Sequence, residues 1–346
     1  MRGVSGRASL KEVRVKARRK GRRLAIVGAG VTGAYLFRLL EREGFEVDLY
    51  DREQRTRCGL RPCAWGTSRG FVELVEQAGL TPEKYILRRL DHVIMDEVVI
   101  KADLMTFDKP QLVKDLLAGA TVHFTPVEVG SYARVIDATG VSRALLPPVV
   151  DDILLGCRQY LIETGEPLAN RIRLGGIGYA WSFPLSPNRY HVGCGSLLED
   201  PESILRNLGW LASTSSREEK KILCRCGARI RITGPHHSRP FVSDGLRDGI
   251  WGIGEAIGCV APLAGDGVVP GMRNVQILLQ NWDDPGKYTE AVLAEFRWME
   301  DERTVIDKVR RAEGAGIKEA WVLRRNSKRM GMEVRLKDAF ALLKHL

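Results

Sequence analysis

The sequence lacks the features of a membrane-spanning or secreted protein. No run of about 18 or more apolar residues occurs, so no segment is long enough to cross a bilayer as a helix. The N-terminal stretch has no apolar core of the kind found in secretion signals. Hydrophobic residues make up 44% and charged residues 28% of the 346 residues, as in ordinary globular proteins. We therefore expect a cytoplasmic protein, at most peripheral on the inner membrane face.

Cysteine and histidine patterns that would indicate disulfides or a metal are also missing. The seven cysteines are an odd number, which favours reduced thiols over a disulfide framework. The pairs Cys58/Cys63 and Cys224/Cys226 do not have the spacing of a zinc or iron–sulfur site. The six histidines form no evident catalytic dyad. The sequence therefore predicts no metal.

The net positive charge lies almost entirely at the N-terminal end of the chain. The net charge is +10, yet residues 1–23 hold ten Lys or Arg and one acid, whereas the remainder has 43 basic and 42 acidic residues. The folded body thus gives no sign of a nucleic-acid partner. Three interpretations of the basic arm stay open: a disordered tail or over-long start, a tether to anionic lipid headgroups, or an RNA contact.

The most informative motif lies directly after this arm. A short apolar strand, 24–27, runs into Gly28, Gly30 and Gly33 at G-x-G-x-x-G spacing, followed by an amphipathic helix and a second strand that ends at Asp51. The glycines permit a tight turn, close approach of backbone to a pyrophosphate, and close helix–strand packing. The terminal acid is placed to accept hydrogen bonds from a ribose. The pattern predicts a dinucleotide site.

Three later segments point to a flavin. Strand-like residues 135–137 lead into a turn at Thr139-Gly140, and the stretch 253–258 places Glu255 after another strand. Residues 262–267 then precede a predicted helix over 268–280, whose N-terminus favours bound negative charge, such as a reduced flavin carries.

With these motifs the chain resembles the FAD-dependent geranylgeranyl reductases, which share the fold of aromatic hydroxylases. The resemblance covers roughly residues 23–283, and Tyr179-Ala-Trp181-Ser-Phe183-Pro184 is its most specific element. Motifs common to many flavoproteins support it: the N-terminal glycines, Arg61-Pro62-Cys63-Ala64, Phe107-Asp108-Lys109, Asp137–Gly140, Gly254–Gly258 and Gly265-Asp266-Gly267. The chain departs from the family at Ala64, usually Gly, at Glu255, usually Asp, and in lacking an Arg before Phe107.

The resemblance implies an α/β fold in which a Rossmann-like FAD-binding domain is interrupted by a mixed or antiparallel substrate-binding sheet. Expected boundaries are a basic arm, 1–22; an FAD-binding domain within 23–283 (about 23–70, 107–145 and 240–283) interleaved with the substrate sheet (about 71–106 and 146–239); and a helical C-terminal segment, 284–346. Along the chain we expect strand-like pieces near 93–100, strands at 179–185 and 190–194, and helices at 71–78, 111–117 and 204–211. Asp200 is expected to cap the last of these helices, with Pro201 at the first helical position.

The motifs and the resemblance together assign the site residues. Cofactor contacts are expected at Gly28, Gly30, Val31, Thr32, Gly33, Asp51, Arg52, Cys63, Ala64, Thr139, Gly140, Gly254, Glu255, Pro262, Gly265, Asp266 and Gly267. Trp65, Tyr179, Trp181 and Phe183 are expected to line a substrate pocket, because alternate residues of a strand share a face. Cys63, Tyr179 or a water is expected to supply a proton.

The implied reaction is reduction of isoprenoid carbon–carbon double bonds in lipids or quinones, with FAD bound noncovalently. No second G-x-G-x-x-G occurs, so NAD(P)H bound transiently or a ferredoxin is expected to supply electrons. Two alternatives stay open. One is a flavin-dependent hydroxylase or halogenase of the same fold, and the other is a degenerate flavoprotein fold that binds without catalysis.

Overall fold

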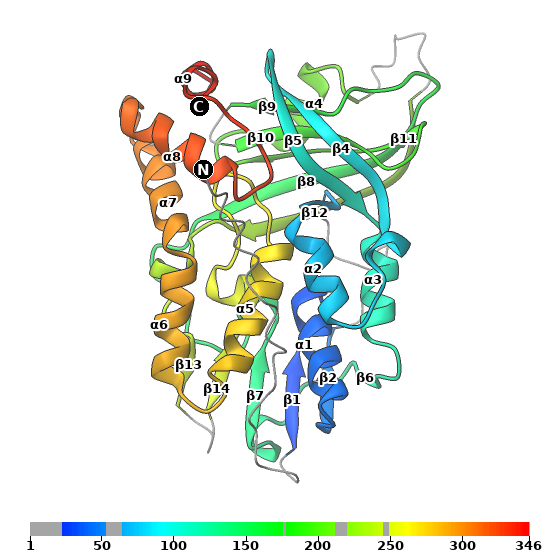
Figure 1. The fold of residues 1–346 in the computed structure, drawn as a ribbon, viewed down its shortest axis with the longest axis vertical. Coiled ribbons are helices and arrows are strands. Elements are labelled where there is room, and N and C mark those ends of the chain that lie inside the picture. The colour runs from blue at the N-terminus through cyan, green and yellow to red at the C-terminus, as the bar shows by residue number, and fades with distance from the viewer. Residues whose placement is uncertain (1–22, 53–63, 176–177, 212–219, 245–248, 346) are drawn as a thin grey trace, which may run out of the picture.

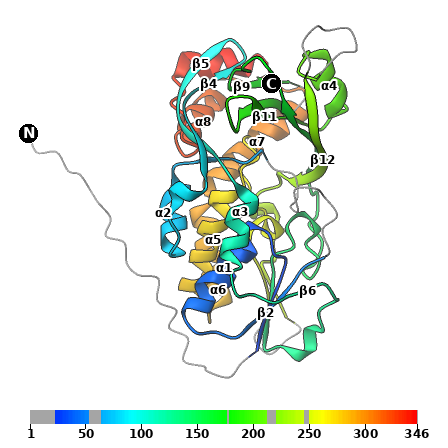
Figure 2. The same cartoon turned by 90° about the vertical axis from the view of Figure 1, so that its right-hand side faces the viewer.

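The protein is built from two sheets, one above the other in Figure 1, in a computed structural model that describes residues 23–52, 64–175, 178–211, 220–244 and 249–345. The lower sheet is mostly parallel and the upper sheet is larger and curved. The helices α6 (Pro285–Glu295) and α7 (Arg297–Arg310) follow one another along one side of the molecule, and α5 (Val268–Gln280) lies beside the lower sheet (Figures 1 and 2). The predicted fold class, a Rossmann-like sheet interrupted by a largely antiparallel one, is confirmed; the exact domain boundaries stay a prediction.

The lower sheet brings together strands from three distant parts of the chain. Its order is β13-β14-β7-β1-β2-β6, and every neighbouring pair is parallel except β13 with β14. Its central strands are buried, as in parallel sheets covered on both faces. Their carboxyl ends share one edge, which faces the upper sheet. The strands are β1 Leu24–Val27, β2 Val47–Tyr50, β6 Val122–His123, β7 Arg134–Asp137, β13 Val242–Ser243 and β14 Ile250–Gly252.

Helices cover the lower sheet with apolar faces. In α1 (Val31–Arg42) the buried residues recur at helical spacing, and Tyr35, Leu36 and Leu40 are fully buried. This helix packs against α5 (Val268–Gln280), whose predicted bounds are confirmed, and against α3 (Lys109–Leu116). The Asp108 carboxylate caps α3 by accepting a hydrogen bond of 3.0 Å from Gln111 N. The remaining helix of this region, α2, spans Gly70–Gln77 and packs on α5.

The upper sheet has the order β12-β8-β11-β10-β9-β4-β5-β3 and is antiparallel except where β4 pairs with β9. The predicted hairpin is present as β10 and β11, in which Trp181 lies opposite Gly193. The strands are β3 Gly66–Ser68, β4 Ile86–Met95, β5 Val98–Phe107, β8 Leu154–Glu163, β9 Arg171–Leu174, β10 Gly178–Pro184, β11 Arg189–Ser196 and β12 Lys221–Arg231.

The strand-like pieces expected near 93–100 belong to two strands, the end of β4 and the start of β5. Residues 96–97 form the turn between these strands, and Asp96 there adopts a left-handed conformation, with φ of 52°. The Asp96 carboxylate is buried and accepts a hydrogen bond from Leu174 N, which holds the turn against β9. The apolar run therefore belongs to two antiparallel strands that pair edge to edge in the upper sheet.

The predicted helical C-terminal segment consists of α6 Pro285–Glu295, α7 Arg297–Arg310, α8 Ile317–Ser327 and α9 Leu336–Leu343. The first two extend the core of the lower sheet, whereas α8 and α9 pack together beside the β4–β5 hairpin. A short helix, α4 (Pro201–Asn207), follows β11, and Asp200 caps it with Pro201 at its first position, as predicted.

Candidate functional site

The three fingerprint glycines meet different spatial demands. Gly28 has a φ of +113°, and a Cβ there would lie 2.2 Å from the Ala138 carbonyl oxygen. At Gly33 a Cβ would lie 1.9 Å from the Gly28 carbonyl oxygen, so this glycine lets α1 pack against the turn. A Cβ on Gly30, in contrast, would meet no atom within 4 Å. Gly28 and Gly33 therefore serve chain packing, and Gly30 faces open space at the N-terminus of α1.

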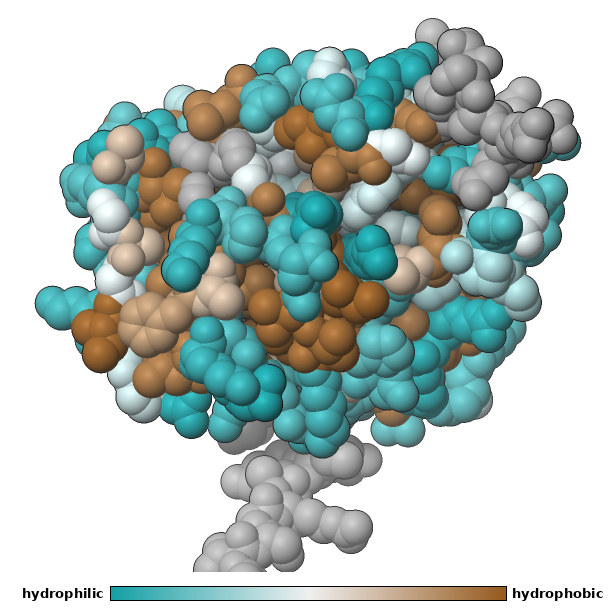
Figure 3. Space-filling view, turned by 90° about the horizontal axis from the view of Figure 1, so that it is seen from above, coloured by the Kyte–Doolittle hydropathy of each residue, from teal (hydrophilic) through white to brown (hydrophobic). Residues whose placement is uncertain are grey.

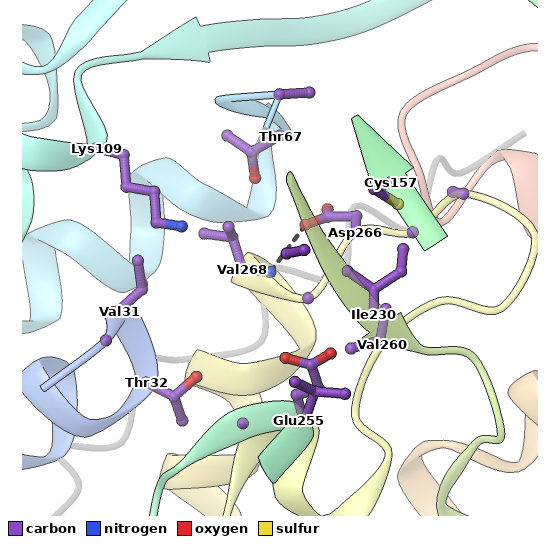
Figure 4. A pocket seen from close by; sticks show the side chains of 18 of the residues that line it. Val31, Thr32, Thr67, Lys109, Cys157, Ile230, Glu255, Val260, Asp266 and Val268 are labelled. Atoms are coloured by element: carbon purple, nitrogen blue, oxygen red, sulfur yellow. Dashed lines mark hydrogen bonds between the residues drawn. The ribbon is translucent and has the colours of Figure 1, made fainter. Parts of the chain in front are cut away.

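That open space is part of a cavity of about 1320 Å³ between the two sheets. Turns from the carboxyl edge of the lower sheet form one end, and the upper sheet forms the other (Figure 4). Predicted cofactor residues on its wall are Gly28, Gly30, Val31, Thr32, Asp51, Arg52, Ala64, Thr139, Gly140, Glu255, Gly265, Asp266 and Gly267. The cavity exceeds the roughly 300–1,000 Å³ usual for a small-molecule site, so it has room for two ligands.

Two acids fix the turns at the lower end. The Asp51 carboxylate accepts hydrogen bonds from Ala29 N at 2.9 Å and Arg52 N at 2.7 Å, which holds it beside the glycine turn. Asp137 is fully buried and accepts from Thr139 N at 3.0 Å and from the Thr139 hydroxyl at 2.7 Å. The first acid thus faces the cavity, and the second shapes the Thr139-Gly140 turn.

The loop before α5 places a partly unsatisfied carboxylate in the cavity. Asp266 Oδ1 accepts a hydrogen bond of 2.8 Å from Val268 N, and Asp266 Oδ2 is buried with no hydrogen-bond partner within the described residues. Burial raises the pKa of Asp266 to about 6. Glu255 also points into the cavity while it accepts a hydrogen bond of 2.8 Å from Arg231 N. A buried carboxylate oxygen without a hydrogen bond costs free energy of folding, so Asp266 Oδ2 is suited to accept a hydrogen bond from a bound ligand.

Three alternating aromatics of β10 form the opposite wall, as their spacing indicated. Tyr179, Trp181 and Phe183 all line the cavity, and the first two rings lie 5.6 Å apart. The Tyr179 hydroxyl donates a hydrogen bond to the Ala264 carbonyl oxygen, which ties the upper sheet to the loop before α5. The Trp181 indole lies over Gly193, where a Cβ would approach the ring to 2.2 Å. The hairpin register therefore makes room for the Trp181 ring, whose plane is tilted by 52° against that of Tyr179.

Some predicted site residues lie elsewhere. Trp65 is not at the cavity wall, because its backbone is left-handed (φ 57°) and its ring packs on His191 at 4.6 Å. Gly254 fits beneath Thr32, and its N–H donates to Asn274 Oδ1, so it supports the wall from behind. Pro262 is buried, and Gly33 lies inside α1. Cys63 lies outside the described residues, and its role stays a prediction.

The sequence interpretation missed the part of the wall contributed by α8, α9 and the segments around them. Apolar side chains of this region close the upper end of the cavity, together with the β4–β5 hairpin: Leu323, Met330, Met332 and Leu342, with Leu90, Met95, Leu104 and Ile172 from the sheet. An amphipathic sequence pattern predicts that one face of a helix is buried, but it does not predict which other element covers that face. Lys109 and Cys157 are further wall residues; the Phe-Asp-Lys motif was a signal for the former only.

A buried acid from α7 also reaches this cavity. Glu302 is 2% exposed, lines the cavity, and accepts hydrogen bonds from Leu263 N at 3.1 Å and from the Asn326 side chain. Burial raises the pKa of Glu302 to about 7, so a large share of this carboxyl is protonated near neutrality. Burial also raises the pKa of the Cys157 thiol to about 12, which leaves that thiol protonated and unreactive.

Metal and membrane-spanning sites are not found in the described part of the chain. There, no group of three or more His, Cys, Asp or Glu is arranged to hold a metal ion. No helix of the described segments is long and apolar enough to span a bilayer.

Comparison with known proteins shows the same fold. A model of an NAD(P)-binding Rossmann-like domain matches residues 26–61. An uncharacterised protein of Methanocaldococcus jannaschii is 24% identical over 84% of this chain and 90% of its own. A geranylgeranyl bacteriochlorophyll reductase-like protein of Thermoplasma acidophilum superposes with a TM-score of 0.69 at 15% identity, over 83% of this chain and 87% of that one. The chain has a flavoprotein fold.

Two further solved structures with this fold are described as a dehydrogenase and a monooxygenase. A flavoprotein/dehydrogenase of Cytophaga hutchinsonii gives a TM-score of 0.60 at 14% identity, covering 82% of this chain and 85% of its own. A probable FAD-dependent monooxygenase of Pseudomonas aeruginosa gives 0.53 at 15% identity, covering 92% and 99%. The resemblance drawn from the sequence is thus confirmed for the fold, and reductase and oxygenase structures both share it.

The residues at the lower end of the cavity fit FAD. Gly30 leaves room beside the N-terminus of α1 for a pyrophosphate, and Asp51 lies where the second strand ends, as ribose contacts require. The unpartnered Asp266 Oδ2 and the N-terminus of α5 offer sites for polar ring atoms at the far end.

Proposed function

We propose that this protein is an FAD-dependent oxidoreductase that reduces carbon–carbon double bonds of isoprenoid chains on lipids or quinones. One observation carries the proposal: the cavity that begins at the dinucleotide fingerprint continues into a lobe walled by aromatic and aliphatic side chains. A polar nucleotide suits the first part and a long apolar chain the second.

The proposed cofactor residues divide by the part of FAD that they serve. Gly30 and the first turn of α1 receive the phosphates, Asp51 binds the ribose hydroxyls, and Glu255 faces the ribityl chain. Lys109 reaches into the same space from the start of α3 and adds a positive charge there.

FAD bound at this site in its reduced form would supply a hydride, which is two electrons and one proton, to one carbon of the double bond, and the other carbon would receive a proton. The protein must therefore exclude water, hold the alkene and deliver that proton. Tyr179, Trp181 and Phe183 present π-faces that tolerate positive charge as the proton arrives. Glu302 is a further proton source to set beside Tyr179 and Cys63, because its carboxyl is protonated near neutrality at the wall of the apolar lobe.

Mass spectrometry tests the proposal. FAD-loaded protein is reduced with dithionite under nitrogen and incubated with polyprenyl lipids and quinones. We expect products heavier by two hydrogens for each double bond reduced, and Gly30→Val, which blocks the phosphate site, serves as the inactive control. A gain of one oxygen atom, seen only in air with NAD(P)H, would instead indicate the hydroxylase alternative. Protein that binds no FAD would overturn both and favour a non-catalytic role.

The electron donor forms part of the same proposal. We expect NAD(P)H bound transiently, or a ferredoxin, to reduce the flavin. Stopped-flow bleaching of the flavin band with each donor distinguishes them.

A further inference from the structure

The outer face of α8 and α9 exposes large apolar side chains. Ile317 and Trp321 lie one turn apart on α8 and are 61% and 49% exposed, and Phe340 on α9 is 38% exposed. The two helices pack against each other, so these residues belong to one end of the molecule (Figure 1). The view onto this end shows hydrophobic patches set among hydrophilic side chains (Figure 3).

Unbalanced positive charge surrounds the apolar residues. Residues 317–345 contain eight Lys or Arg and three acids. All three acids are engaged in ion pairs: Glu319 with Lys308, Glu333 with Lys101, and Asp338 with Arg335. Four exposed lysines have no ion pair within the described residues: Lys318, Lys328, Lys337 and Lys344. The Arg324 guanidinium lies 4.8 Å from the centre of the Trp321 ring and adds to the positive field.

The inner face of the same helices lines the cavity. Leu323 of α8 and Leu342 of α9 reach the apolar lobe, as does Met330 from the segment between them. Only one layer of helix thus separates the charged outer face from the interior space.

We infer that the outer face of α8 and α9 docks onto an anionic lipid bilayer. Helices that carry Trp, Phe and Ile among lysines lie in the interface of a bilayer, where the apolar side chains enter the acyl boundary and the lysines meet lipid headgroups. Nucleic acid offers the same negative charge but no apolar layer for Ile317. Docking of this face is independent of the proposed function and of the basic arm, which lies outside the described residues.

Vesicle binding of the full chain tests the inference. The probes are phosphatidylcholine vesicles with and without one third phosphatidylglycerol, assayed by co-sedimentation. We expect binding only to the anionic vesicles, with a loss of about fivefold for each lysine removed near the surface. The double variant Lys318→Glu with Lys337→Glu is therefore expected to bind at least about 25-fold more weakly. The matched control, Lys114→Glu with Lys221→Glu on α3 and β12, changes the net charge equally and is expected to retain clearly tighter binding.

A second readout locates the contact. Brominated lipids are expected to quench Trp321 fluorescence, seen as the difference between the wild type and Trp321→Phe. Equal vesicle affinity of the helix and control variants, or no Trp321-dependent quenching, would overturn the inference and assign binding to the arm. Absence of vesicle binding together with lysine-dependent binding of an RNA duplex would overturn it in favour of nucleic acid.

Discussion

The two ends of the cavity are built in opposite ways. The lower end consists of backbone turns at the carboxyl edge of a mostly parallel sheet. Gly28 and Gly33 there lie against other backbone atoms, and Gly30 leaves open space. The upper end consists of side chains from β10, the β4–β5 hairpin and two C-terminal helices, brought together only by tertiary packing. A nucleotide site made of backbone tolerates few substitutions, whereas an apolar wall made of side chains can change its shape and so its substrate. The predictions below test this difference.

The largest effect is expected at Gly30. Gly30→Val is expected to abolish FAD binding, because its side chain enters the space left for the pyrophosphate, yet to leave the fold intact, because its Cβ meets nothing within 4 Å. Bound flavin absorbance and thermal unfolding check this. Gly33→Val is the contrasting variant, because its Cβ would lie 1.9 Å from a carbonyl oxygen. It should lower the free energy of unfolding by about 1–3 kcal/mol. Flavin retained by the Gly30 variant would contradict the placement of the site.

A substitution at the upper end of the cavity should affect the substrate without affecting FAD binding. Leu323→Trp is expected to lower kcat/KM for a long polyprenyl substrate at least tenfold, about 1.4 kcal/mol, by filling the apolar lobe, and to leave the affinity for FAD unchanged. Val322→Trp is the matched control, since Val322 is a neighbouring half-buried residue that is not on the cavity wall. Equal losses in both variants would indicate a general packing defect, and a loss of FAD affinity would show that the two ends are not separable.

A pH-dependent effect is expected where the two ends meet. Burial raises the pKa of Glu302 from 4.5 to about 7, so the native state binds more protons than the unfolded state between these values. The contribution of Glu302 to the free energy of unfolding is fully present below about pH 4.5. It declines by up to about 3 kcal/mol as the pH rises through about 7. In Glu302→Gln the free energy of unfolding should therefore change less with pH between these values.

Urea unfolding at several pH values measures the slope for Glu302. Glu295→Gln, at an exposed position of α6, is expected to leave the profile as it is in the wild type. An unchanged slope in Glu302→Gln would show that this carboxyl is ionised in the native protein.

The smallest effect is expected at Cys157. Its thiol lines the cavity, but burial raises its pKa to about 12, so it is protonated at neutral pH. Cys157→Ser should leave turnover within about twofold, and the wild-type thiol should resist alkylation by iodoacetamide, as peptide mapping can show. Rapid modification that stops turnover would make this cysteine part of the chemistry.

The difference between the two ends also explains what could be predicted from the sequence. The fingerprint, the Asp51 position and the helix 268–280 follow local rules of spacing, and the structure contains the predicted strand–turn–helix order. The aromatic wall was predictable because alternate residues of one strand share a face. Trp65 was misplaced because a left-handed residue turns its side chain away, which spacing does not reveal. Glu302 and α8 enter the cavity through contacts across the whole chain, for which the sequence carries no local signal.

One optical titration tests the central claim that a single cavity holds both FAD and an apolar chain. A long polyprenyl lipid is added to oxidised, FAD-loaded protein, and the flavin absorption band is recorded. We predict a saturable change of the band that is lost in Leu323→Trp and kept in Val322→Trp. Lipid that binds without altering the flavin spectrum, or alters it equally in both variants, would contradict the claim.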